Sequence, residues 1–143
     1  MNLNMFIPIG IIVFSNVFYH ISMKSTPANI NTFASLVITY AIASISSLAM
    51  YFFTVKNPNL MAEYQHLNWS SIVLGISVIG LEFGFILMYK VGWAISAGEI
   101  VAASFLAIIL LFVGYFIYGE PISLQKICGI VICLSGLYLL SKQ

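Results

Sequence analysis

Apolar residues in this chain form long continuous runs, without the regular polar positions of a helix that faces water on one side. A bilayer core about 30 Å thick is spanned by roughly 20 apolar residues in a helix, which satisfies its own backbone hydrogen bonds in lipid. Five runs meet this requirement, and they predict membrane helices at Met5 to Met23, Phe33 to Val55, Trp69 to Tyr89, Val91 to Tyr118 and Leu124 to Leu140. The predicted fold class is therefore an all-α integral membrane protein.

Short polar breaks separate these runs. "KSTPANIN" contains Pro27, "KNPNLMAEYQHLNW" contains Pro58, "YKVGW" is a minimal hairpin, and "GEPIS" ends the fourth run at Gly119 and Pro121. Connections this short make neighbouring helices antiparallel. We therefore predict one transmembrane domain over residues 1–143, with no second domain.

Composition excludes several classes of function. Of the 143 residues, 62% are hydrophobic and 6% are charged, whereas a soluble domain carries about 25% charged residues. A net charge of +1 does not provide the basic surface that nucleic-acid binding requires. The chain shows no phosphate-binding glycine loop, metal-ligand spacing, or nucleophile with its base, so we expect neither an enzyme nor a cofactor or metal site. Cys128 and Cys133 are five residues apart on one predicted helix, on different faces, and cannot pair with each other.

The lysines are balanced between the two sides of the membrane. Lys24, Lys90 and Lys142 fall on one side, and Lys56, Lys126 and the N-terminal amine fall on the other. Because the excess of lysine and arginine sets orientation, this balance predicts that the chain inserts both ways round. The alternative is a single orientation chosen by weaker signals.

Two glutamates lie inside apolar runs. A carboxylate at the centre of a membrane helix costs about 2.5 to 3.5 kcal/mol on insertion scales, so such a residue is a functional candidate. Glu82 precedes Tyr89 by seven residues, about 10 Å of helix, and Glu99 follows Trp93 by six, about 9 Å, from the same interface.

The first predicted helix ends at this same interface. Asn16 and His20, one turn apart, therefore lie in the same half of the membrane as the two glutamates. We predict that Asn16, His20, Glu82 and Glu99 form a polar cluster, with Trp93 between the glutamates, that binds substrate, a cation or a proton.

Structural interpretations of the same residues are also open. Glu82 could pair with Lys90 through the long lysine stem, and Glu99 could be a partly hydrated residue of a first helical turn. His20 could be a hydrogen-bonded wall residue, and Trp93 a membrane anchor, the default role of aromatic residues near segment ends.

The chain resembles the drug/metabolite transporter superfamily, in particular its EamA-like five-helix unit. The resemblance is carried by the apolar stretch that begins "AGEIVAAS", the turn "YGEPIS", the following "QKICGI", the closing "SGLYLL", and "SNVFYHISMKSTP" at the end of the first helix. Larger members are similar to two such units fused in inverted orientation around a cavity lined by the first, third and fourth helices of each half. The resemblance thus implies half of a ten-helix architecture, completed by an inverted homodimer.

The small multidrug resistance family is a related group of four-helix antiparallel dimers. Its glycine pair in the last helix, a dimer contact, is similar to Gly129 and Gly136, whose seven-residue spacing marks one helix stripe. Its essential glutamate in the first helix is replaced here by Asn16, which cannot carry a proton.

The predicted function is a secondary transporter of a small organic metabolite or cation, in a bacterial or archaeal cell membrane. It would act as an inverted homodimer by alternating access, and the glutamates would carry a coupling proton if transport is proton-driven. The alternatives are a non-transporting membrane subunit, which predicts one orientation and a structural Glu82–Lys90 pair, and a half-transporter with a different partner chain, which predicts a clear lysine bias.

Overall fold

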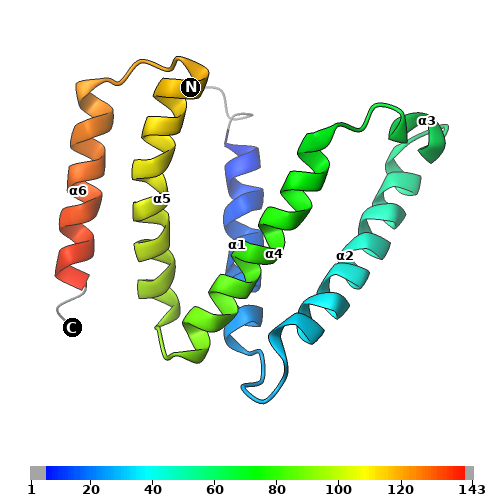
Figure 1. Ribbon diagram of the computed structural model, residues 1–143, viewed down its shortest axis with the longest axis horizontal. Coiled ribbons are helices and arrows are strands. Elements are labelled where there is room, and N and C mark those ends of the chain that lie inside the picture. Colours follow the sequence, from blue (N-terminus) through cyan, green and yellow to red (C-terminus); the bar gives the residue numbers. More distant parts are fainter. Residues whose placement is uncertain (1–5, 141–143) are drawn as a thin grey trace. The chain divides into compact units, whose positions relative to one another are not determined.

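The computed structural model describes residues 6–140, with side chains for residues 6–136. Every regular element in this range is a helix (Figure 1), and the helices are α1 (Ile7–Lys24), α2 (Thr32–Thr54), α3 (Leu60–Tyr64), α4 (Trp69–Lys90), α5 (Ile95–Tyr118) and α6 (Leu124–Leu140). Helices α1, α2, α4 and α5 are long and apolar enough to cross a membrane, and α6, with 17 residues, is the shorter fifth. The predicted fold class is confirmed. Met5, where the first predicted helix begins, lies outside the described residues.

Asparagines explain where two of the membrane helices begin. The Asn31 side chain accepts hydrogen bonds from Phe33 N at 2.9 Å and Ala34 N at 3.2 Å, and Asn68 accepts one from Ser70 N at 2.9 Å. Each bond satisfies a backbone N–H that has no partner within the helix. The polar breaks of the sequence are therefore helix caps as well as loops.

The connection between α2 and α4 holds a short helix, α3, where the sequence analysis predicted a loop. Asn59 caps it by accepting a hydrogen bond from Ala62 N at 3.2 Å, and Asn59 N donates to the Tyr51 hydroxyl at 2.8 Å. The five residues of α3 are too few to give a periodic apolar pattern, which is why the sequence did not indicate them.

The fourth predicted membrane helix begins four residues later than expected, at Ile95 instead of Val91. Gly92 has a φ of 104°, and Ala94 is extended with a ψ of 145°. A positive φ interrupts a right-handed helix and favours glycine, which has no Cβ. The apolar run continues through the hairpin, so hydropathy alone could not reveal this break.

The described residues form two compact units, which are divided between Val91 and Gly92. In the first, α4 packs against both α1 and α2, and in the second α5 packs against α6. The core of the first unit contains Met23, Leu36, Ile86 and Tyr89. Most other large apolar side chains are exposed on the single chain, as expected for helices whose solvent is lipid.

Candidate functional site

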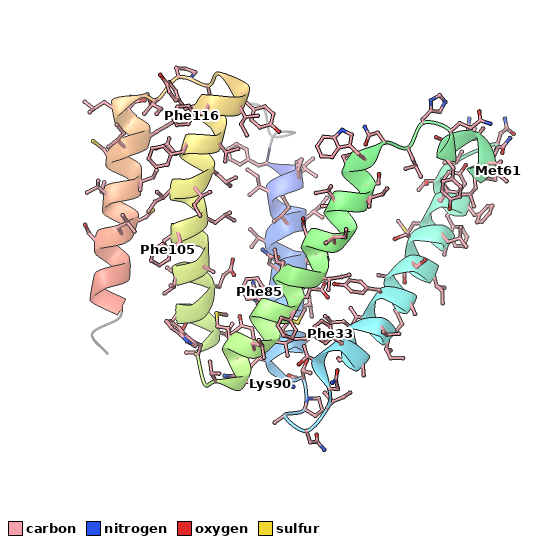
Figure 2. The ribbon with its side chains drawn as sticks, in the orientation of Figure 1. Phe33, Met61, Phe85, Lys90, Phe105 and Phe116 are labelled. Atoms are coloured by element: carbon pink, nitrogen blue, oxygen red, sulfur yellow. The ribbon has the colours of Figure 1, made fainter. Side chains whose placement is uncertain are left out.

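His20 is held in the core of the first unit by α4. It is 7% exposed, and its Nδ1 lies 2.9 Å from the Tyr89 hydroxyl, in hydrogen-bonding contact. Its ring also meets the ring of Phe85 edge-on, with 4.9 Å between centroids, and Phe85 projects from α4 (Figure 2). His20 is therefore buried at the α1–α4 contact.

Tyr89 has a different role from the one that the sequence suggested. Its place at the end of a predicted helix indicated an anchor at the lipid headgroups, but the side chain is 5% exposed. The Lys24 ammonium lies over its ring, 5.5 Å from the centroid, at a distance suited to a cation–π contact. Tyr89 thus contacts two residues near the end of α1: its hydroxyl contacts His20 and its ring contacts the Lys24 ammonium.

Lys90, the last residue of α4 (Figure 2), is bound to the loop between α1 and α2. Its Nζ donates to Ile30 O at 2.9 Å and to Thr32 Oγ1 at 3.3 Å. The structural interpretation of Glu82 as the ion-pair partner of Lys90 is therefore wrong for this conformation. The lysine anchors the start of α2 to the end of α4.

Glu82 lies on the buried face of α4 and is 8% exposed. The Tyr40 hydroxyl on α2 lies close enough to its carboxylate for the two groups to interact. Among the residues that the structure describes, Glu82 Oε2 and Tyr40 Oη are both buried without a hydrogen-bond partner. Two polar groups from different helices thus face each other at membrane depth.

The antiparallel register of α2 and α4 explains this pairing. Lys90 contacts Thr32, and Ile86 and Leu36, each 2% exposed, share one core cluster. One further step of four residues along each helix leads to Glu82 and Tyr40, since residues four apart share a helix face.

Nearby aromatic packing fixes the same pair of helices. The rings of Phe33 on α2 and Phe83 on α4 are stacked, with centroids 4.7 Å apart and planes 10° apart. Stacking of this kind adds about 0.5–1.5 kcal/mol to the burial of the rings. The α2–α4 contact thus combines stacked aromatic rings with the apolar pair Leu36 and Ile86 and with polar groups.

Asn16 lies one turn before His20 on α1 and is exposed on the single chain. Helices α1 and α4 run in the same direction, since His20 contacts Phe85 and Tyr89 near the ends of both. Asn16 therefore lies at about the same level along the helices as Glu82, and its part in a polar cluster stays a prediction.

The other predicted site residues belong to the second unit. Trp93 lies in the hairpin before α5 and is 43% exposed, and Glu99 is half-buried. Because α5 begins at Ile95, Glu99 is the fifth residue of the helix, just beyond its first turn. The cluster that would join Glu99 and Trp93 to Glu82 stays a prediction.

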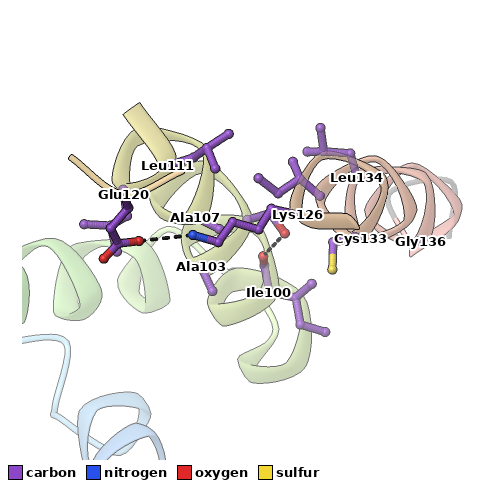
Figure 3. Close-up of a pocket in the computed structure, with 13 residues that line it drawn as sticks. Ile100, Ala103, Ala107, Leu111, Glu120, Lys126, Cys133, Leu134 and Gly136 are labelled. Carbon is purple, nitrogen blue, oxygen red and sulfur yellow. Dashed lines mark hydrogen bonds and ion pairs between the residues drawn. The ribbon is translucent and has the colours of Figure 1, made fainter. Parts of the chain in front are cut away.

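Helices α5 and α6 enclose an apolar groove of about 980 Å³ (Figure 3). Small residues form much of its lining, among them Ala103, Ala107, Gly129 and Gly136. At one end, Lys126 forms an ion pair with Glu120 at 3.1 Å. The predicted glycine pair therefore lies on one face of α6, as its spacing indicated, and its role as a dimer contact stays a prediction.

Sequence reasoning missed Tyr40 as a site residue. It lies eight residues inside α2, where a hydroxyl has no access to the interface and usually needs a hydrogen-bond partner. That signal was present in the sequence, but a long apolar helix does not indicate which neighbour a tyrosine faces.

Together, four apolar helices of membrane length, a shorter fifth and a carboxylate buried on one of them define a multi-pass membrane protein. The chain belongs to the EamA-like transporter family, which it matches over residues 4–142. The resemblance seen in the sequence is thus confirmed, and the protein is a membrane transporter. Comparison with curated proteins found no match, and comparison with solved structures found none either.

Proposed function

We propose that the protein is a secondary transporter of a small organic metabolite or cation, and that it works as an inverted homodimer by alternating access. The observation that carries this proposal is Glu82, a carboxylate 8% exposed on a membrane helix. Its Oε2 has no hydrogen-bond partner among the described residues, and Lys90 is bound elsewhere. Buried carboxylates of this kind mark ion, substrate or proton pathways in membrane proteins.

The position of Lys90 favours this function over a non-transporting subunit. That alternative requires Glu82 to have a structural role, most simply as the partner of Lys90, whose ammonium instead contacts Ile30 and Thr32. Keeping an unpaired carboxylate in lipid costs about 2.5 to 3.5 kcal/mol, and a binding function gives a reason for that cost.

The balanced lysines support the inverted homodimer. Lys24 and Lys90 lie at one end of the first unit, where Lys24 contacts the Tyr89 ring and Lys90 contacts the α1–α2 loop. Lys56 follows the opposite end of α2. Lys142 and the N-terminal amine lie outside the described residues. With no charge bias, two copies of one chain can insert in opposite directions and form the inverted repeats that alternating access uses.

Orientation is the first test of the dimer. Reporters fused to Gln143, one active only inside the cell and one active only outside, are expected to give signal in both fusions. Signal from a single fusion would end the inverted homodimer and direct the search to a separate partner chain.

Flux in proteoliposomes tests the role of the glutamates. Vesicles loaded with a pH-sensitive dye are exposed in turn to amines, amino acids and sugar derivatives, and the wild-type protein is expected to change the internal pH with at least one class. Glu82→Gln is expected to abolish this change, whereas Glu63→Gln, a matched substitution in the exposed helix α3, retains it. Normal flux in both Glu82→Gln and Glu99→Gln would remove the glutamates from the mechanism.

A further inference from the structure

The facing oxygens of Glu82 and Tyr40 are the least satisfied polar pair in the first unit. Glu82 Oε2 and Tyr40 Oη are both buried without a hydrogen-bond partner among residues 6–136. A buried polar group left unsatisfied costs about 1–3 kcal/mol. A third group that satisfied both oxygens would therefore be bound favourably.

The chemistry of the two oxygens determines what that group must carry. An ionised carboxylate accepts hydrogen bonds and donates none, and a tyrosine hydroxyl can accept as well as donate. The two lysines at this end of the unit are engaged elsewhere, Lys24 over the Tyr89 ring and Lys90 at the α1–α2 loop. A positively charged donor with more than one N–H, supplied from outside the unit, would satisfy both oxygens at once.

We propose that Glu82 and Tyr40 together bind the ammonium group of an amine substrate that carries at least two N–H donors. One N–H is directed at Glu82 Oε2 and another at Tyr40 Oη, so primary and secondary amines fit the pair and quaternary ammonium ions do not. The inference rests on the proposed function, since it names the substrate class of the same site. It adds Tyr40, on a second helix, as the residue that selects between amines.

The test compares two ligands that differ at the ammonium nitrogen. Equilibrium binding of phenethylammonium and of its N,N,N-trimethyl derivative is measured on the purified full chain. The wild-type protein is expected to prefer phenethylammonium by about tenfold or more, because each hydrogen bond to a charged group contributes roughly 1.5–3 kcal/mol, which corresponds to at least about tenfold in affinity. Glu82→Gln is expected to weaken binding of phenethylammonium by about tenfold to a hundredfold.

Tyr40→Phe separates selection from packing, because it removes the hydroxyl and keeps the ring. It is expected to reduce the preference for phenethylammonium by about tenfold or more, the loss of one hydrogen bond from the charged ammonium, while binding of the trimethyl derivative stays unchanged. The matched control is Tyr51→Phe on the same helix, whose hydroxyl contacts Asn59 N at the other end. The control is expected to keep the wild-type preference.

The outcomes distinguish this inference from the proposed transport. Equal affinity of the wild-type protein for the two ligands, or no binding of either, overturns the inference without any variant. A preference that Tyr40→Phe leaves unchanged also overturns it. If another class of solute is transported at a rate that Tyr40→Phe does not change, the proposed transport stands and the amine site is excluded. If the protein selects between the amines but transports no solute, only the proposed transport is excluded.

Discussion

Replacing Lys90 with methionine tests whether this lysine anchors the α1–α2 loop or serves Glu82. Methionine keeps most of the apolar stem and removes the ammonium. The loss comprises two hydrogen bonds, to Ile30 O at 2.9 Å and to Thr32 Oγ1 at 3.3 Å. At a net 0.5–1.5 kcal/mol for each bond, the free energy of unfolding is expected to fall by about 1–3 kcal/mol.

The assay is reversible unfolding of the full chain in mixed micelles, followed by near-ultraviolet circular dichroism. Lys56→Met is the matched control, since it also removes one positive charge, at an exposed site beyond α2, and is expected to change the free energy by no more than about 0.5 kcal/mol. Equal effects of Lys90→Met and Lys56→Met would refute the anchor.

A double-mutant cycle identifies the partner of Lys90. Thr32→Val removes the acceptor with little change in shape, and its coupling to Lys90→Met is expected to be about 0.5–1.5 kcal/mol. The coupling of Lys90→Met to Glu82→Gln is expected to be near zero, because the ammonium does not contact that carboxylate. A coupling above about 0.5 kcal/mol with Glu82→Gln would show that the two residues form an ion pair in the membrane, against the contacts described here.

Four further substitutions, one of them a matched control, test local features by the same unfolding measurement. Tyr89→Phe removes the hydroxyl that contacts His20 and is expected to cost about 1 kcal/mol; no loss would show that this buried contact contributes little. Gly119→Ala places a Cβ at a φ of 65° and is expected to cost about 1 kcal/mol, whereas Gly75→Ala, inside α4 with open space at its Cβ, is expected to be neutral or stabilising. Asn31→Ala removes the side chain that caps the start of α2 and is expected to cost about 0.5–2 kcal/mol; an unchanged free energy would show that the cap is dispensable in lipid.

The sequence by itself determined the fold class, four helices of membrane length with a shorter fifth, and the family. Membrane helices are set by the length and hydropathy of a run, both of which are local properties. Helix ends at Asn31, Asn68 and Gly119 also follow local rules, because a cap depends on residues within one turn. The depth of Glu82 could be predicted for the same reason, since the rise per residue of a helix is constant.

The tertiary structure decided which neighbours the polar residues contact. A helix that is apolar on every side gives no sign of which face it buries, so the sequence could not choose between Lys90 and Tyr40 as the neighbour of Glu82. That choice depends on the rotation and register of α2 against α4, which the contacts from Lys90 to Thr32 and the packing of Leu36 with Ile86 determine. The burial of Tyr89 against His20 arose in the same way, because an aromatic residue at a helix end becomes an anchor or a core residue according to the helix beside it.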